Sequence, residues 1–196
     1  MLTVQNNSGI VPNFSDQKTL TSWRDIFMKV GSYNKAENEA TQAHINEKNP
    51  GYLWFKKVVF PKIKNLFGDD IGLIFAMYQS TQAPVKLHND YDVDYIPEYV
   101  TGKPYVSMLI PYSVDHTPEL CSNTSTVILQ PGHQDDLYET LLSHCDPAEV
   151  SKYELKDNHV WKTGDLVWWD TKLTHASNNF RKTNTSKESF VIHIYK

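Results

Sequence analysis

The sequence predicts a mainly β domain with flanking helices, an α+β protein in which N-terminal helices support a β-rich core. Amphipathic helical patterns occupy the first third of the chain, and short β-branched and aromatic segments follow from Ile71 onward. No internal repeat or charged linker separates these two parts. With 196 residues, 40% of them hydrophobic, the chain is long enough for one domain with a sizeable core. We therefore expect a single domain over residues 1–196, with helical support over 1–70 and a β core over 71–196.

Two helical regions are predicted in the N-terminal part. The first follows Ser15, a residue type that caps helices, and keeps apolar side chains at helical spacing until the glycine at position 31. The second runs from Tyr52 to Phe67 and contains Pro61, which must kink or divide it. We expect this pair to support one face of a sheet.

The predicted strands come next. Each is short, rich in β-branched or aromatic residues, and bounded by Pro, Gly, Asn or Asp. They cover residues 71–79, 104–112, 125–131, 165–170 and 189–195. A helical insert is predicted at about 135–145, followed by a short helical turn in the segment DPAEVSKY. Many short strands with turn signals indicate a sandwich or a barrel.

Composition and charge exclude several classes of protein. The formal net charge of -4 argues against a general polyanion binder, and therefore against a nucleic-acid substrate. The chain shows neither the pattern of a signal peptide nor an apolar run long enough for a membrane span, so we expect a cytoplasmic protein. Cys121 and Cys145 are too few for a disulfide framework and too far apart for a CxxC zinc pair.

The residues that carry chemistry lie in two places. His88 and Asp90 are two positions apart, so on a strand both side chains would face the interior and could share one metal ion. His175 follows the strand-like segment 165–170 and can supply a third ligand. Two imidazoles and one carboxylate on one face leave positions of an octahedral ion open, as in Fe(II) oxygenases. An isolated H-x-D pair more often marks a surface turn or a hydrogen-bonded pair, so the argument depends on the ordered set.

This ordered set resembles the motif of the 2-oxoglutarate/Fe(II)-dependent dioxygenase superfamily. A strand leads into H-x-D, more strands follow, a second His comes after an apolar strand that begins with Gly-Asp, and a basic residue opens the last strand. The resemblance covers about residues 71–195 and implies a double-stranded β-helix, or jelly roll. It implies His88, Asp90 and His175 as iron ligands, Fe(II) as the cofactor, and 2-oxoglutarate and O₂ as co-substrates. The implied reaction is hydroxylation with release of succinate and CO₂.

The resemblance also implies an anchor for 2-oxoglutarate. Lys187 lies twelve residues beyond His175, where family members carry a basic side chain for the distal carboxylate. Ser189 shares the strand face of Lys187, similar to the R-x-S pair of some members, with Lys in place of Arg. Lysine supplies a point charge without the bidentate fork of arginine. Arg181 is the alternative anchor, although its segment has the composition of a hairpin turn.

Further residues have two interpretations each. Tyr78 resembles a tyrosine that donates its hydroxyl to 2-oxoglutarate in some branches of the family, and an ordinary core aromatic is the alternative. His193 falls on the face of Lys187, where a packed histidine is expected rather than a fourth ligand. Asp92 and Asp94 continue the alternation from Asp90 and either contact substrate or form a solvated loop. One of three tryptophans otherwise assigned to the core can line the pocket: Trp161, Trp168 and Trp169.

Three other classes remain open. A cupin-like metal protein would use the same jelly roll without 2-oxoglutarate, but cupins usually carry H-x-H and need no Lys187. A non-catalytic binding module is the second. The third is an AlkB-like nucleic-acid demethylase, because L-H-x-D-x-D is similar to the motif of those enzymes, although His193 stands where they carry a second Arg. We expect a small-molecule or protein side-chain substrate, and no pattern predicts its identity or the oligomeric state.

Overall fold

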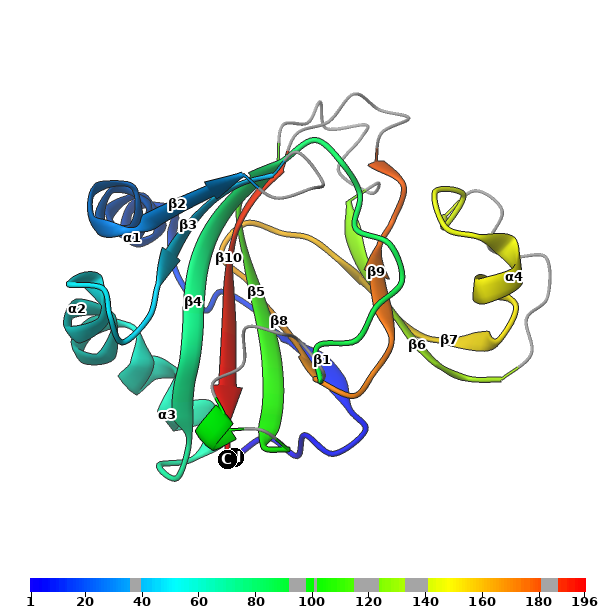
Figure 1. The fold of residues 1–196 in the computed structure, drawn as a ribbon, viewed down its shortest axis with the longest axis horizontal. Helices are drawn as coiled ribbons and strands as arrows, with labels where there is room; N and C mark the ends of the chain where they lie inside the picture. The colour runs from blue at the N-terminus through cyan, green and yellow to red at the C-terminus, as the bar shows by residue number, and fades with distance from the viewer. Residues whose placement is uncertain (36–39, 92–97, 101, 115–123, 133–140, 181–186) are drawn as a thin grey trace.

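Two antiparallel β-sheets face each other in the computed structural model, and the helices α1, α2 and α3 cover the outer face of the larger sheet (Figure 1). The structure describes residues 1–35, 40–91, 98–100, 102–114, 124–132, 141–180 and 187–196. No helix among these residues is long and apolar enough to cross a membrane. The two sheets and the helices that cover one of them confirm the predicted mainly β fold with flanking helices.

The described strands form one sheet of seven and one of three. The larger has the order β1 (Ser8–Val11), β8 (Leu166–Asp170), β5 (Pro104–Val114), β10 (Lys187–Tyr195), β4 (Gly72–Thr81), β3 (Thr41–Ile45) and β2 (Ser32–Lys35). The smaller has the order β7 (Tyr153–Val160), β6 (Ser125–Pro131) and β9 (His175–Ser177). All five predicted strands are present, each within two residues of its predicted bounds.

The helices differ from the prediction in detail. They are α1 (Gln17–Val30), α2 (Gly51–Val58), α3 (Phe60–Phe67) and the short α4 (Pro147–Val150). The cap of α1 is Asp16 rather than Ser15, because the Asp16 carboxylate accepts a hydrogen bond from the Thr19 backbone N–H at 2.7 Å. The predicted division of the second helical region is confirmed, since Pro61 lies in the first turn of α3 just after the break at Val59.

The description of residues 1–70 as helical support was incomplete. Strand β1 pairs with β8 at one edge, and β3 and then β2 extend the sheet beyond β4 at the other, so this segment supplies both edges of the larger sheet. These strands are only four or five residues long, and so short a stretch shows too little alternation to distinguish a strand from a loop. The insert predicted at 135–145 lies partly outside the described residues, and its described part, 141–145, forms turns rather than a helix.

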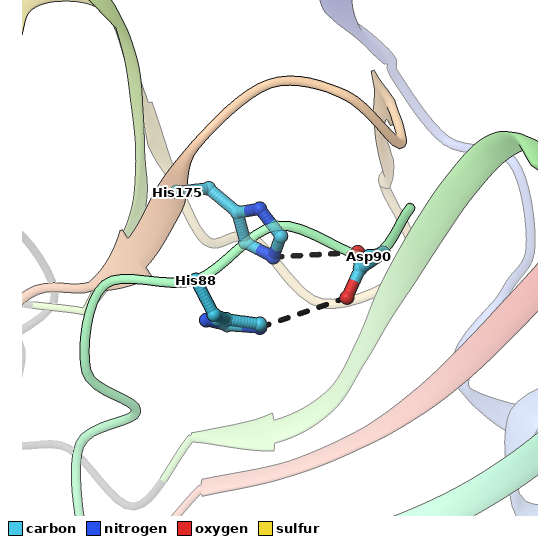
Figure 2. Close-up of side chains that lie close together, drawn as sticks. All are labelled: His88, Asp90 and His175. Atoms are coloured by element: carbon cyan, nitrogen blue, oxygen red, sulfur yellow. Dashed lines mark ion pairs between the residues drawn. The ribbon is translucent and has the colours of Figure 1, made fainter. Parts of the chain in front are cut away.

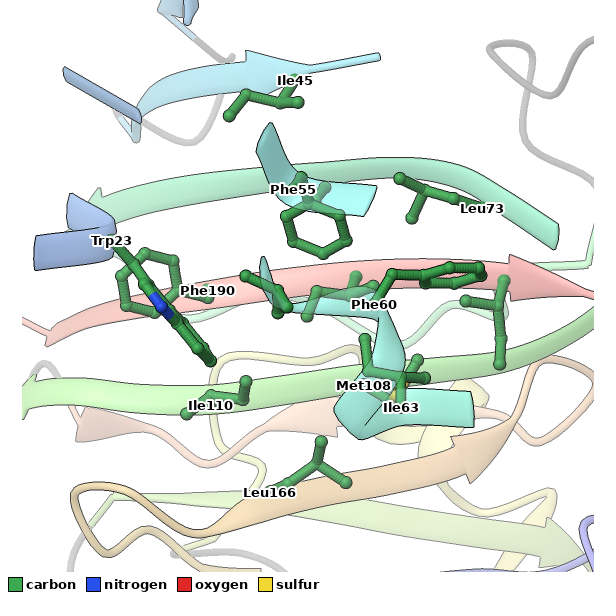
Figure 3. Packing of buried hydrophobic residues seen from close by; sticks show 14 of the residues in the cluster. Trp23, Ile45, Phe55, Phe60, Ile63, Leu73, Met108, Ile110, Leu166 and Phe190 are labelled. Carbon is green, nitrogen blue, oxygen red and sulfur yellow. The ribbon is translucent and has the colours of Figure 1, made fainter. Parts of the chain in front are cut away.

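The largest hydrophobic cluster lies between the helices and the larger sheet (Figure 3). Phe190 of β10 meets Trp23 and Phe27 of α1 edge to face, with ring centroids 5.9 and 5.4 Å apart. Because side chains alternate along a strand, the next positions of β10 face the smaller sheet. Figure 3 shows Phe190 on the helix side, and that packing directs Lys187, Ser189 and the residues in phase with them into the space between the sheets.

Candidate metal centre

Backbone hydrogen bonds hold the two parts of the predicted ligand set together. The His88 N–H donates to the His175 carbonyl at 3.0 Å, and the His175 N–H donates to the His88 carbonyl at 2.8 Å. The Asp90 N–H donates to the Thr171 carbonyl at 3.0 Å. The expectation that His88 and Asp90 lie on a regular strand was wrong, because His88 forms only an isolated bridge to His175. That bridge, rather than a strand, fixes the ligands side by side.

The three side chains converge on one point (Figure 2). Asp90 Oδ1 lies 3.6 Å from His88 Nε2, and Asp90 Oδ2 lies 3.4 Å from His175 Nε2. One donor atom from each residue falls within 4.8 Å of the others. Ligand atoms bound roughly 2.1 Å from one ion at right angles are about 3 Å apart. The observed spacing therefore fits a single divalent ion after small side-chain shifts.

Both imidazoles are oriented to present Nε2 to that point. His88 Nδ1 lies 2.8 Å from the Lys86 carbonyl oxygen, and His175 Nδ1 lies 3.1 Å from the Leu173 carbonyl oxygen. A carbonyl oxygen only accepts, so each Nδ1 carries a proton, and in the neutral imidazole the free lone pair then lies on Nε2. Hydrogen bonds of this kind orient metal-binding histidines in known sites.

Asp90 is buried and held by two donors. Its Oδ2 accepts from Ser107 Oγ at 2.6 Å and from Trp169 Nε1 at 3.1 Å. Burial alone would raise the pKa of this carboxyl, but the neighbouring imidazoles, His175 foremost, and the Ser107 hydroxyl hold the pKa well below its ordinary value. Burial and the adjacent His88 lower the pKa of His175 to about 4. An ionised carboxylate and a neutral imidazole are the forms that bind a divalent metal.

A cavity of about 270 Å³ opens between the two sheets beside these ligands. All three ligands line it, together with Lys187 and His193 of β10. Its other described lining residues are mostly apolar or uncharged: Gln42, Met77, Gln79, Val85, Leu109, Thr126, Trp161, Trp169, Ala176, Ser177 and Val191. A cavity of this kind, apolar with a few converging polar groups, is typical of small-molecule sites.

Lys187 enters the cavity from the first position of β10. It is 3% exposed, and no carboxylate of the described residues lies within ion-pair distance of its ammonium group. Burial lowers its pKa to about 7. Ser189 is also buried, and its Oγ accepts a hydrogen bond from Gln79 Nε2 at 3.2 Å. The structure thus places a buried amine, with the hydrogen-bonded pair of Ser189 and Gln79 nearby, in the cavity that His88, Asp90 and His175 also line.

Tyr78 lies on the other face of the larger sheet, and the prediction that it binds 2-oxoglutarate is corrected by this position. Its hydroxyl accepts from Arg24 Nε at 3.0 Å, and its ring packs 5.5 Å from that of Phe190 in the helix-side core. Alternation along β4 places its neighbours Met77 and Gln79 in the cavity instead. Tyr78 is therefore the core aromatic of the alternative interpretation.

The other candidates divide in the same way. His193 lines the cavity and stacks on Phe75 at 4.5 Å, outside the group of three ligands. Trp161 and Trp169 line the cavity, whereas Trp168 packs against Phe67 on the helix side. Three further candidates lie outside the described residues: Asp92, Asp94 and Arg181.

Sequence reasoning missed Ser107, which orients the buried carboxylate. The only signal was one small polar residue in the middle of the apolar strand 104–112, which is too weak to assign a role. Thr126 and Gln42, which line the cavity, carried no recognisable pattern either.

Comparisons with known proteins agree on the fold. No family model and no curated protein matches the chain by sequence. Among solved structures, HygX from Streptomyces hygroscopicus with nickel and 2-oxoglutarate bound is similar at TM-score 0.61 and 12% identity, over 100% of this chain and 87% of that chain. The α-ketoglutarate-dependent epimerase SnoN from nogalamycin biosynthesis matches at TM-score 0.60 and 10% identity, over 97% and 77%.

A third similar structure, a Pseudomonas putida prolyl-4-hydroxylase, matches at TM-score 0.53 and 12% identity, over 97% of this chain and 93% of that chain. At such identities the likeness establishes the fold. The chain shares the jelly-roll fold of these solved oxygenases, as the motif led us to expect, and the His-Asp-His group is present in it.

Proposed function

We propose that this protein is a non-haem Fe(II)- and 2-oxoglutarate-dependent oxygenase that hydroxylates a small molecule or a protein side chain. The observation that carries the proposal is one cavity lined by His88, Asp90 and His175 and also by the buried ammonium group of Lys187. A metal site alone would fit a cupin-like protein. An ammonium group in the same cavity can pair with the second carboxylate of an organic diacid, and so favours 2-oxoglutarate as the co-substrate.

His88, Asp90 and His175 would hold the iron, and their donor chemistry fits it. Two neutral imidazoles and one carboxylate bind Fe(II) and leave neighbouring positions open for a chelating 2-oxo acid and O₂. When bound, the metal supplies the O₂ activation that couples decarboxylation of 2-oxoglutarate to oxidation of the substrate.

The protein's own residues bind 2-oxoglutarate and orient the Asp90 carboxylate. Lys187 attracts the C5 carboxylate of 2-oxoglutarate, and Ser189 on the same strand face lies beside Gln79 as a further polar contact. Ser107 and Trp169 fix the Asp90 carboxylate, and the apolar walls keep water out. The structures of HygX with nickel and 2-oxoglutarate, and of SnoN with Fe³⁺ and α-ketoglutarate, support this arrangement in the same fold.

The substrate class rests on two kinds of support. HygX has been crystallised with hygromycin B and SnoN with nogalamycin RO, and another neighbour is a prolyl-4-hydroxylase. The net charge of -4 disfavours a nucleic acid. We further propose that residues 1–196 act as one catalytic domain, because β1 and β3 from the N-terminal segment complete the sheet that carries Lys187.

The test is succinate formation. Purified protein with Fe(II), 2-oxoglutarate and air should release succinate slowly even without substrate, through uncoupled turnover, and should retain iron. His175→Ala should lose both, because it removes a buried ligand. His159→Ala, a half-buried histidine on β7 that does not line the cavity, is the matched control and should keep both. Full iron content and succinate formation in His175→Ala would refute the assignment.

A further inference from the structure

The Lys187 ammonium lies over two aromatic rings. Its Nζ is 4.2 Å from the centroid of the Trp161 ring and 4.5 Å from that of Phe180. A cation within about 6 Å of a ring face is attracted by the negative face of the ring, and most strongly where water is excluded. Phe180 is fully buried and Trp161 is 4% exposed, so both contacts are shielded from solvent.

Hydrogen bonds fix the Trp161 indole and the backbone at Phe180. The Trp161 backbone N–H donates to the Thr124 carbonyl at 2.8 Å, and its indole Nε1–H donates to Thr126 Oγ1 at 2.9 Å. The Phe180 N–H donates to the Asn178 carbonyl at 2.9 Å. Because both rings are buried, they give the ammonium a fixed aromatic contact surface beside the cavity, called the ring slot below.

We propose that Trp161 and Phe180 are positioning residues for the co-substrate, which keep the Lys187 ammonium charged and directed at the far carboxylate of a 2-oxo diacid. This inference rests on the proposed function. A guanidinium reaches a carboxylate with a fixed planar fork, whereas an ammonium group on a flexible stem has no preferred direction. The ring slot restricts the direction in which the ammonium group points, and so compensates for the replacement of Arg by Lys.

The charged groups around the slot support this role. On the cavity side, the other described titratable residues are the three proposed metal ligands, His88, Asp90 and His175, and the nearby His193. Burial is the cause that lowers the pKa of Lys187, and among the described residues no neighbouring carboxylate offsets it. Glu188, next on β10, instead interacts with Arg24 and Tyr78 on the helix side. The rings are thus the described groups that stabilise the ammonium before the diacid binds.

A consequence follows for binding. With a pKa of about 7 in the free protein, Lys187 loses its charge as the pH rises above 7, so the affinity for a diacid should fall by up to about tenfold for each further pH unit. A 2-oxo monoacid such as pyruvate keeps the keto acid chelate but has no second carboxylate. Its affinity should therefore not follow this dependence.

The experiment measures binding of 2-oxoglutarate and of pyruvate to the Mn(II)-loaded protein by calorimetry between pH 6 and pH 9. Phe180→Leu removes one ring face and keeps the site apolar. It should weaken 2-oxoglutarate binding roughly 5- to 30-fold at pH 7.5 and move the loss of affinity to lower pH, with pyruvate binding unchanged. Phe55→Leu, which removes a buried ring of α2 on the helix side, should leave both acids unaffected. Trp161→Leu is a second, independent removal of a ring, with the same expected result.

The outcomes separate the two claims. If both acids bind and the ring variants follow the wild-type pH profile, the positioning role is refuted while the proposed function stands. If the wild-type affinity for 2-oxoglutarate does not change with pH, the same conclusion holds. If the Mn(II)-loaded wild type binds neither acid, the proposed function fails together with the inference.

Discussion

Replacement of Lys187 by methionine should stabilise the metal-free protein while it destroys the co-substrate site. Methionine keeps an unbranched apolar side chain and removes the charge. The pKa of Lys187 is about 7 in the folded protein and 10.5 in the unfolded chain. At pH 7, protonation of Lys187 is therefore much less favourable in the folded protein than in the unfolded chain. One pKa unit corresponds to about 1.4 kcal/mol, which gives a cost on the order of 4 kcal/mol at pH 7. We expect the free energy of unfolding of Lys187→Met to exceed that of the wild type by a large part of this cost.

The sign of the pH dependence follows from the same two pKa values. Above pH 10.5 lysine is neutral in both states and costs nothing. As the pH falls from 10.5 towards 7, the unfolded chain takes up a proton that the folded protein does not, so the wild type loses stability, and below pH 7 the cost is complete. The advantage of Lys187→Met should therefore shrink by about 2 kcal/mol between pH 7 and pH 9.

Urea denaturation of the metal-free protein at pH 7, 8 and 9 provides the assay, with Lys57→Met on the exposed surface of α2 as the matched control. Calorimetry with Mn(II) should show that Lys187→Met no longer binds 2-oxoglutarate tightly. A destabilised Lys187→Met protein whose difference from wild type is the same at all three pH values would refute the reasoning.

Three further predictions test the site and its supports. Ser107→Ala removes a 2.6 Å hydrogen bond to the Asp90 carboxylate and should weaken metal binding roughly 10- to 100-fold in a metal titration, so an unchanged affinity would contradict the role of Ser107. Tyr78→Phe should lower stability by about 1 kcal/mol through loss of the Arg24 hydrogen bond and leave 2-oxoglutarate affinity intact. A large loss of affinity would show that Tyr78 contributes to binding of 2-oxoglutarate. Gly164→Ala should destabilise the fold by roughly 1–3 kcal/mol in a thermal melt, because Gly164 has φ +85° and its Cβ would lie 2.2 Å from the Ser15 carbonyl oxygen; wild-type stability would contradict this strain.

The phase of each strand decided which of the predicted strand residues line the cavity. On β10 the polar residues Lys187, Ser189 and His193 alternate with Phe190 and Ile192, so the sequence itself indicates which face is unusual. On β4 both faces are buried, and apolar residues occupy nearly every position. Alternation then predicts two faces without saying which one meets the helices, and for that reason both interpretations of Tyr78 stayed open.

The convergence of His88, Asp90 and His175 was predictable, and their local structure was not. His88 and Asp90 were placed together because of their spacing, but what brings His175 beside them is a pair of backbone hydrogen bonds between an irregular segment and the three-residue strand β9. Neither segment is long enough to show a periodic pattern. The support from Ser107 and the ring slot around Lys187 come from distant parts of the chain and arise only on folding.

The most direct test of the central claim is an anaerobic absorption spectrum of the protein with Fe(II) and 2-oxoglutarate. A 2-oxo acid chelated to Fe(II) gives a weak metal-to-ligand charge-transfer band in the visible range. Wild-type protein should show this band only when both components are present, and His175→Ala should not show it. No band from the wild type at saturating Fe(II) and 2-oxoglutarate, or an equal band from His175→Ala, would contradict the account.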